Sequence, residues 1–408
     1  MTVYANSVEG SVQWERLLAE RTQHMQSSAI RELLKVTEQP DVISFGGGMP
    51  APELFPVREI EEACEYLLRE EPMTALQYSA TEGYRPLREY LAESMARYGI
   101  QHGADNILIT TGSQQALDLV GKIFIDTDAP VITERPTYLG AIQAWQAYEA
   151  RFLTVPLDDD GMIVDELPEL LKKETPRFIY VLPNFHNPAG TTLSEERRLR
   201  LVELAREHDL IIVEDDPYGA LRFEGEDIIP IAALAPERTI YLGTFSKTLA
   251  PGLRIGWIVA PAEIIRRLVQ GKQGTDLHTS TFDQMIANDI AQRGILKAHV
   301  RKIRTVYHER RDVMLEALEE FWPEGSSWTR PVGGLFLWAQ VPEPINTLDF
   351  MRTALANKVA YVPGCNFYPL KDGGFNAMRL NFSNARPDRI VEGIRRLGEA
   401  FKEELLHP

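Results

Sequence analysis

The chain has 408 residues, of which 44% are hydrophobic and 25% are charged, and its formal net charge is −16. This length predicts a large domain plus a smaller one, and the acidic charge argues against nucleic acid or an anionic membrane as the main partner. The sequence has two cysteines, no apolar run of about 18 residues and no basic, apolar start, so we expect a cytoplasmic protein without a disulfide framework.

The first hundred residues are expected to be helical, with two breaks. Apolar spacing predicts two short helices within 14–39, a helix over 57–69 and another over 84–98. The break at 44–52 contains three successive glycines, and the second break covers 77–83. Glycines let a backbone approach a ligand closely, although a flexible turn explains them equally well.

From residue 106 onward, buried strands alternate with amphipathic helices. Strands are expected at 106–110, 130–133, 151–155, 178–182, 210–213, 239–242 and 255–259, with helices at 116–124, 138–148 and 194–208. Such alternation predicts an α/β domain with a largely parallel sheet. Ligands of these sheets lie at the carboxyl ends of the strands. The polar residues that stand out there are Ser113, Asn187, Asp215 and Lys247.

The last third of the chain indicates a long helix followed by a small α+β domain. The helix covers 295–321; short strands are expected at 335–339, 360–362 and 378–382, and helices at 347–357 and 387–406. We therefore divide the chain into an N-terminal helix and arm (1–56), a large domain (57–294), a connecting helix (295–322) and a small domain (323–408). The N-terminal helix is expected to complete the small domain.

Lys247 occupies an unusual position between two apolar strands. Lysine is rarely buried, and burial lowers its pKa toward the neutral amine that Schiff-base chemistry needs. Arg254 follows seven residues later, across the turn Pro251-Gly252, and could hold an anion near that amine. On this stretch alone, a loop whose charges face water remains an alternative.

Two groups of residues suit a phosphate. Gly112-Ser113-Gln114 opens a helix, where free amides and the helix dipole bind anions, although Ser113 could simply be an N-cap. Arg254, with Thr244 and Ser246, could complete a phosphate cup, unless Arg254 belongs to a surface ion pair.

The remaining polar residues suit a flat, charged ring. Asp215 ends a buried strand and needs a cation, such as a protonated ring nitrogen; a metal site or a solvated acidic turn at 214–216 is the alternative. Tyr218 and Asn187 could both reach a phenolic oxygen, although Asn187-Pro also favours a turn. Tyr138 could stack on a ring or pack in the core. Together with the lysine amine and the phosphate cup, these groups describe pyridoxal 5′-phosphate.

On these motifs the sequence resembles the fold-type I pyridoxal-phosphate aminotransferases of class I, nearest to the branch of 2-aminoadipate aminotransferase and kynurenine aminotransferase II. The resemblance extends from residue 30 to the last helix. Its most specific stretches are 44–56, 76–79, 110–118, 187–190, 214–218, 243–254 and 378–383.

The resemblance implies a role for each candidate residue. Lys247 forms the internal aldimine and, once freed, carries a proton from the substrate Cα, while Asp215 pairs with the pyridinium nitrogen. Tyr218 and Asn187 bond the ring hydroxyl, and Tyr138 stacks on the ring. The phosphate is held by Ser113, Gln114, Thr244, Ser246 and Arg254, and by Tyr78 of the other subunit of a homodimer. The substrate α-carboxylate is held by Arg379, Asn187 and the backbone at Gly48. No metal is implied.

The chain departs from the family pattern at two of these positions. Thr244 stands where many relatives have serine, and the hydroxyl is kept. Gly46 stands where close relatives often have alanine, which could alter the mobility of the flap.

Substrate choice is expected to involve Ser28 and Arg31 on the N-terminal helix. In this branch the matching arginine receives an acidic side chain or moves aside for an apolar one, whereas an ion pair of Arg31 with Glu32 is the alternative. We expect broad specificity for 2-aminoadipate, glutamate, leucine or aromatic amino acids, with 2-oxoglutarate as acceptor.

Two other functions remain open at this point. The same fold supports lyases and decarboxylases, which need no 2-oxo acid acceptor. Some transcription regulators carry a similar domain behind a DNA-binding module, but about 30 residues before the pattern leave no room for one here, and the charge is acidic.

Overall fold

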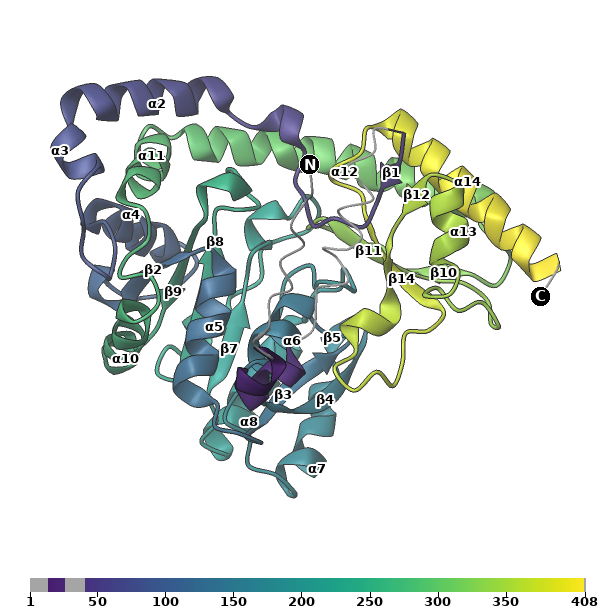
Figure 1. The fold of residues 1–408 in the computed structure, drawn as a ribbon, viewed down its shortest axis with the longest axis horizontal. Helices are drawn as coiled ribbons and strands as arrows, with labels where there is room; N and C mark the ends of the chain where they lie inside the picture. The colour runs from purple at the N-terminus through teal and green to yellow at the C-terminus, as the bar shows by residue number, and fades with distance from the viewer. Residues whose placement is uncertain (1–13, 26–40, 407–408) are drawn as a thin grey trace, which may run out of the picture.

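The computed structural model describes residues 14–25 and 41–406. Figure 1 shows a large sheet flanked by helices, a smaller sheet beside it, and a long helix that runs from one to the other. The N-terminal segment contributes two short 3₁₀ helices, Trp14–Leu17 and Glu20–His24. The rest of the two helices predicted within 14–39 falls mostly outside the described residues. None of the helices in the described part is long and apolar enough to cross a membrane.

The large sheet has eight strands in the described chain, in the order β2-β9-β8-β7-β6-β3-β4-β5. Strands β8, β7, β6, β3 and β4 run parallel, whereas β9 is antiparallel to both β2 and β8, and β5 is antiparallel to β4. The predicted, largely parallel α/β sheet is therefore confirmed. The strand bounds are β2 Ile107–Thr111, β3 Pro130–Arg135, β4 Arg151–Asp158, β5 Gly161–Met162, β6 Ile179–Val181, β7 Ile212–Asp215, β8 Thr239–Thr244 and β9 Ile255–Val259.

Both faces of this sheet are buried, because side chains alternate between the faces along each strand. Leu108 on β2 packs into the cluster that contains α5 (Ser113–Phe124), α6 (Leu139–Gln146) and α10 (Ala262–Gln273). Ile107 and Ile109 point the other way, into the cluster with α4 (Arg85–Ala96) and α11 (Thr281–Gln292). Continuous apolar runs such as Ile212-Val213 are therefore expected in these strands.

Shorter or more peripheral helices complete the large body. These are α2 Val57–Glu70, α3 Pro72–Ala75, α7 Leu167–Leu171, α8 Glu195–Glu207 and α9 Ile231–Leu234. Helices α2, α4 and α8 lie where the sequence predicts them. Helices α10 and α11 are not predicted, although Ile265, Leu268 and Val269 of α10 are buried at helical spacing and carry the periodic signal.

The smaller body is built on one antiparallel sheet and two long helices. Its strands are β10 (Ser327–Trp328), β11 (Phe336–Gln340), β14 (Ala377–Asn381) and β13 (Val362–Pro363), in that order. The long helix α12 (Ile295–Phe321) packs along the C-terminal helix α14 (Pro387–Leu406), and both have the predicted bounds. The predicted helix at 347–357 is shorter, α13 Met351–Ala356.

The strand predicted at 360–362 is wrong as a single element. The chain forms β12 (Val359–Ala360), which pairs with β1 (Ile43–Ser44), and then β13, which pairs with β14. Between them the fully buried Tyr361 donates a hydrogen bond to the Thr347 carbonyl at 2.6 Å, which fixes the change of sheet. The pairing of β1 with β12 attaches the N-terminal arm to the smaller body.

Candidate active site

The topology of the large sheet brings three charged residues to one edge. Asp215 ends β7, and Lys247 follows the end of β8. Because β9 runs antiparallel to β8, Arg254, which directly precedes β9, also lies at the carboxyl edge of the parallel strands. Ligands of open α/β sheets bind at this edge.

The Lys247 side chain is partly buried. Its Nζ donates a hydrogen bond to the Gly48 carbonyl at 2.7 Å. Burial lowers its pKa to about 8, with smaller contributions from the positive charges of Arg379 and Arg254. A large neutral fraction near neutral pH makes this amine a nucleophile.

Asp215 is a buried carboxylate with an incomplete set of partners. It is 2% exposed, and its Oδ2 accepts a hydrogen bond from the Tyr180 hydroxyl at 2.8 Å. Its Oδ1 has no hydrogen-bond partner among the described residues. Burial raises its pKa to about 7, and the Tyr180 hydroxyl only partly offsets this. A buried carboxylate in this condition favours a cationic hydrogen-bond donor.

The three acidic residues at 214–216 face different partners. Glu214 accepts hydrogen bonds from the backbone N–H groups of Ile231 and Ala232, at 3.0 and 2.7 Å, at the start of α9. Asp216 accepts from the Asn184 amide at 3.0 Å, from the Gly219 N–H and from the Tyr241 hydroxyl. Within the described ranges, none of the three belongs to a cluster that could hold a metal ion. The alternatives of a metal site and of a solvated acidic turn therefore receive no support.

The turn between β2 and α5 has the open donors of an anion site. Gly112 has a φ of +74°, and a Cβ there would lie 2.4 Å from Arg254 Nη2, so a glycine is required. Ser113 is the first residue of α5 rather than its N-cap, and its buried Oγ has no partner in the described chain. The Gln114 side chain instead donates to the Gly140 carbonyl at 2.9 Å, which leaves its backbone N–H in the first turn of the helix.

The opposite side of the turn is formed by Thr244, Ser246 and Arg254. Thr244 Oγ1 accepts from the Ser246 N–H at 3.0 Å and donates to the Ile255 carbonyl at 3.0 Å. Arg254 makes only long hydrogen bonds, at 3.4 Å, to the carbonyls of Pro251 and Thr111, and no ion pair with the described residues. A surface ion pair, the alternative for Arg254, is thus not seen.

Arg379 is a buried cation without an acidic partner in the part of the chain that the structure describes. It lies on β14, is 1% exposed, and its guanidinium lies over the rings of Phe336 and Phe367, 4.2 and 5.1 Å from their centroids. Its Nη1 donates to Asn187 Oδ1 at 2.8 Å and its Nη2 to the Gly46 carbonyl at 2.6 Å. Burial lowers its pKa to about 10, so the side chain stays charged at neutral pH.

Asn187 links Arg379 to the hydroxyl group of Tyr218. Its Nδ2 donates to the Tyr218 hydroxyl at 3.3 Å. Burial raises the pKa of Tyr138, and the charges of Asp215 and Arg379 act on the same hydroxyl. The sequence-based set Lys247, Asp215, Asn187, Tyr218, Tyr138 and Arg379 therefore gathers in one region.

The glycine-rich segment 46–48 is held against this region by β14. Asn381 Nδ2 donates to the Gly47 carbonyl, and Ser383 Oγ donates to the Met49 carbonyl at 3.0 Å. A Cβ on Gly48 would come within 3.3 Å of the Phe336 ring. Sequence reasoning missed Tyr180, Phe336 and Asn381 as site residues, because their partners are far away along the chain.

Tyr78 does not join the other candidates within its own chain. It is 79% exposed, and its ring meets the edge of His278 at 5.8 Å between centroids. Its loop is held by the buried Gln284, which accepts from the Tyr84 N–H at 2.7 Å and donates to the Thr279 carbonyl at 2.8 Å. Ser28 and Arg31 lie outside the described residues.

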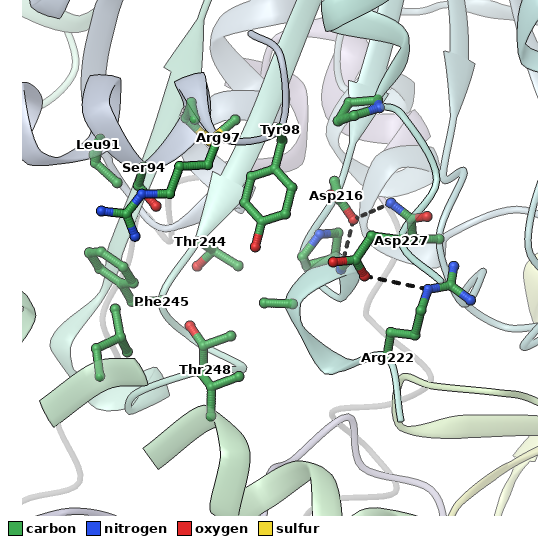
Figure 2. Close-up of a pocket in the computed structure, with 18 of the residues that line it drawn as sticks. Leu91, Ser94, Arg97, Tyr98, Asp216, Arg222, Asp227, Thr244, Phe245 and Thr248 are labelled. Carbon is green, nitrogen blue, oxygen red and sulfur yellow. Dashed lines mark hydrogen bonds and ion pairs between the residues drawn. The ribbon is translucent and has the colours of Figure 1, made fainter. Parts of the chain in front are cut away.

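A separate cavity of about 500 Å³ opens behind the same strand ends, between α4, α12 and the loop after β7 (Figure 2). Thr244, Phe245 and Thr248 line it, but Lys247, Asp215 and Arg379 do not. Figure 2 shows Asp216 on the side of this cavity. Asp216 therefore lies beside this cavity, whereas the preceding residue, Asp215, faces the candidate site.

The chemistry of the donor set fits pyridoxal 5′-phosphate. The unpartnered Asp215 Oδ1 suits a protonated pyridine nitrogen, and Ser113 Oγ, the helix amides and Arg254 suit a phosphate. The amine of Lys247 suits an aldehyde.

Comparison with known proteins agrees with this chemistry. The model of the family "Aminotransferase class I and II" matches residues 40–397. The aromatic-amino-acid aminotransferase 1 of Thermococcus litoralis is 50% identical over 402 residues, covering 97% of this chain and 96% of that protein. The 2-aminoadipate transaminase of Thermus thermophilus is 45% identical over 394 residues, covering 95% and 97%.

Solved structures show the same fold. A Pyrococcus horikoshii kynurenine aminotransferase in complex with PMP is 47% identical, with a TM-score of 0.93 over 97% of this chain and 99% of that chain. The α-aminoadipate aminotransferase LysN of Thermus thermophilus, complexed with N-(5′-phosphopyridoxyl)-L-leucine, is 43% identical, with a TM-score of 0.91 over 97% and 100%. This chain therefore belongs to the class I and II aminotransferases, and it is a pyridoxal-phosphate-dependent enzyme of the fold-type I group.

Proposed function

We propose that this aminotransferase moves the amino group of 2-aminoadipate, glutamate, leucine or an aromatic amino acid to a 2-oxo acid such as 2-oxoglutarate. The observation that carries the proposal is the meeting of three charged groups, two of them buried and one partly buried. A partly neutral amine (Lys247), a carboxylate with an open acceptor (Asp215) and an arginine without an acidic partner in the described chain (Arg379) lie in one region.

The cofactor is assigned to residues as follows. Asp215 holds the ring nitrogen, Tyr218 and Asn187 hold the ring hydroxyl, and Tyr138 lies against the ring. The phosphate is assigned to Ser113, the backbone of Gln114, Thr244, Ser246 and Arg254. Support comes from the free Oγ of Ser113 and from the two weak hydrogen bonds of Arg254.

Pyridoxal 5′-phosphate, when bound, supplies an aldehyde for the amino group and a ring that withdraws electrons from the substrate. Lys247 would hold the group through its nucleophilic amine, and the same amine, when free, is the group that would accept the proton from the substrate Cα. A pKa of about 8 suits both tasks, because the amine can accept and return a proton near neutral pH.

Arg379 is proposed to bind the substrate α-carboxylate, together with Asn187 and the backbone at Gly48. Charge-assisted pairing of a guanidinium and a carboxylate is strong in a buried site. Since Arg379 lies on β14 in the smaller body and Lys247 in the larger one, substrate binding would draw the two bodies together. The division into 1–56, 57–294, 295–322 and 323–408 is part of this proposal.

The substrate range rests on relatives whose names include aromatic amino acids and 2-aminoadipate. We assign the choice between acidic and apolar side chains to Arg31, with Ser28 beside it, as the sequence resemblance implies. An arginine that can pair with a carboxylate or move aside accommodates both classes.

A homodimer in the cytoplasm completes the proposal. Tyr78 is assigned to the phosphate of the partner subunit, because its side chain is exposed and lies away from the site of its own chain. An exposed tyrosine is well suited to a polar contact across an interface.

Replacement of Lys247 tests the reaction. Lys247→Ala is expected to abolish turnover and the absorbance of the lysine-bound cofactor, and Lys247→Arg to do the same, because a guanidinium stays protonated. Both are measured by the coupled transamination assay and by absorbance spectra. In cofactor-free wild type, the rate of cofactor attachment should rise with pH around pH 8, where the amine loses its proton. Transamination by Lys247→Ala at the normal rate would refute the assignment.

Replacement of Asp215 tests the open carboxylate. The pKa of Asp215 is about 7 in the folded protein, above the ordinary value of 3.8. As the pH rises between these two values, the unfolded chain releases this proton before the folded protein does. The free energy of unfolding of the cofactor-free protein therefore falls over this range. Asp215→Asn should therefore raise the free energy of unfolding by on the order of 1–3 kcal/mol at pH 8 and much less at pH 4. Urea unfolding of cofactor-free protein measures this.

The matched control is Glu214→Gln, one residue earlier. Burial raises the pKa of Glu214 to about 7 as well, but both of its carboxylate oxygens accept backbone N–H groups, so the amide should raise the free energy of unfolding at pH 8 less than Asp215→Asn does. A loss of stability in Asp215→Asn at pH 8 would show that Asp215 is already satisfied by the protein. With cofactor bound, Asp215→Asn should have a lower kcat than wild type, because an asparagine does not keep the ring nitrogen protonated.

Mixing of inactive subunits tests the role of Tyr78 and the dimer. Lys247→Ala and Tyr78→Phe proteins, each impaired alone, should regain activity after unfolding and refolding together, because a mixed dimer holds one site with both residues. With random pairing, about a quarter of all sites in the mixture are intact. Tyr66→Phe, another exposed tyrosine, should not behave like Tyr78→Phe. If Tyr78 acts within its own subunit, mixing brings no gain.

A donor panel tests substrate choice. We expect Arg31→Ala to lower kcat/KM selectively for 2-aminoadipate and glutamate, and to leave leucine and phenylalanine nearly unchanged, since only the acidic side chains pair with the guanidinium. Steady-state rates with 2-oxoglutarate as acceptor, for wild type and variant, provide the comparison. An equal loss on all four donors would remove Arg31 from the specificity site, and turnover without any acceptor would indicate a lyase.

A further inference from the structure

Lys272 is a buried lysine that takes no part in the site described so far. It lies near the end of α10 and is 0% exposed. Its Nζ donates hydrogen bonds to Gln115 Oε1 at 2.6 Å, Asp276 Oδ1 at 2.8 Å and Thr279 Oγ1 at 3.0 Å. An ammonium group has three N–H donors, so this set satisfies all of them. A fully buried lysine is rare unless it is paired in this way.

Asp276 connects Lys272 to Thr111, the last residue of β2. Its Oδ2 accepts from Gln115 Nε2 at 2.7 Å and from the Thr111 hydroxyl at 2.9 Å. Burial favours the neutral acid, but the hydrogen bonds from Lys272, Gln115 and Thr111 outweigh it and lower the pKa of Asp276. The cluster is therefore an ionised pair with neutral partners on both sides.

The neutral partners flank the turn assigned to the phosphate. Thr111 directly precedes Gly112-Ser113-Gln114, and Gln115 directly follows it. Gln115 Oε1 also accepts from the Thr111 N–H at 2.8 Å, which closes the turn upon itself. The Thr111 carbonyl accepts from Arg254 Nη2 at 3.4 Å. One ion pair thus clamps both ends of the turn and reaches the arginine opposite.

We propose that Lys272 and Asp276 are positioning residues that hold the turn Gly112–Gln114 in the geometry that binds the cofactor phosphate. The proposal rests on the proposed function, in which that turn is a phosphate site. Neither side chain needs to touch the cofactor. Their effect is to fix the direction of the backbone N–H groups and of Ser113 Oγ. Donors that already point in the binding direction hold an anion more strongly than donors that must first be ordered.

The test separates phosphate recognition from general stability by comparing two ligands. Pyridoxamine 5′-phosphate and pyridoxamine share the ring and differ in the phosphate. Neither has an aldehyde, so attachment to Lys247 plays no part in the measurement. Dissociation constants for both are measured by calorimetry on cofactor-free wild type, Lys272→Met and Asp276→Asn.

Both variants should bind pyridoxamine 5′-phosphate about tenfold more weakly than wild type and pyridoxamine nearly as well. The double variant should lose less than the product of the two single losses, because the residues form one pair. The matched control is Lys122→Met. Lys122 donates to Thr275 Oγ1 at 2.6 Å, on the same connecting segment, and lies 3.8 Å from Asp118. Within the described residues it makes no hydrogen bond or ion pair with Thr111 or Gln115, so the affinities of this variant should stay unchanged.

An equal loss of affinity for both ligands, or no loss for the phosphorylated one, overturns the proposal. Should Lys272→Met fail to fold, Thr111→Val serves in its place, since it removes only the hydroxyl that reaches Asp276. It should give a smaller loss that is still confined to the phosphorylated ligand, and a loss shared by both ligands counts against the proposal. These results are independent of the Lys247→Ala experiment. A protein with normal phosphate discrimination but no transamination would contradict the proposed function alone.

Discussion

The gathering of charged groups between one edge of the large sheet and β14 of the smaller body is the constraint on which the rest of the structure depends. Asp215 and Arg379 are buried and Lys247 is partly buried, and the described residues give none of the three an ion-pair partner. Burial shifts each pKa toward the neutral form. Such an arrangement costs folding free energy, because buried charges are stable only when they are paired. In the proposed function, a ligand that brings an aldehyde, a protonated ring and a carboxylate to the same place offsets this cost.

The large sheet makes this arrangement possible through one reversed strand. Parallel strands place Asp215 and the segment before Lys247 at the same edge. The antiparallel β9 then begins at that edge, so the connection 245–254 brings Arg254 back beside the turn at Gly112. The apolar core beneath, in which β7, β8 and β9 are buried on both faces, fixes these backbone ends. Rigid strands therefore supply the precision that the polar groups need.

The sequence predicts the parts of this site that are local. Alternating strands and helices, the lysine between apolar strands and the glycine turn before α5 follow from spacing and residue type alone. The partners that decide charge behaviour are not local: Tyr180 is 35 positions from Asp215, and Asn381 is 334 positions from Gly47. A pattern also does not reveal that Tyr361 separates two strands of different sheets, or that the side chain of Gln114 turns toward α6. These features depend on packing between distant segments.

The guanidinium of Arg379, in the smaller body, is held in place by two hydrogen bonds and has further donors beyond those two. Five N–H donors are available on an arginine. One is directed at Asn187 and one at Gly46, and Nε has no partner among the described residues. Both rings beside the guanidinium, Phe336 and Phe367, hold its plane but take none of its donors. In the proposed function, a substrate carboxylate binds to the remaining donors while the two existing hydrogen bonds keep the group in place. The same contacts join the glycine segment, the Asn187 loop and β14, so under the proposed function this one side chain would link substrate binding to the approach of the two bodies.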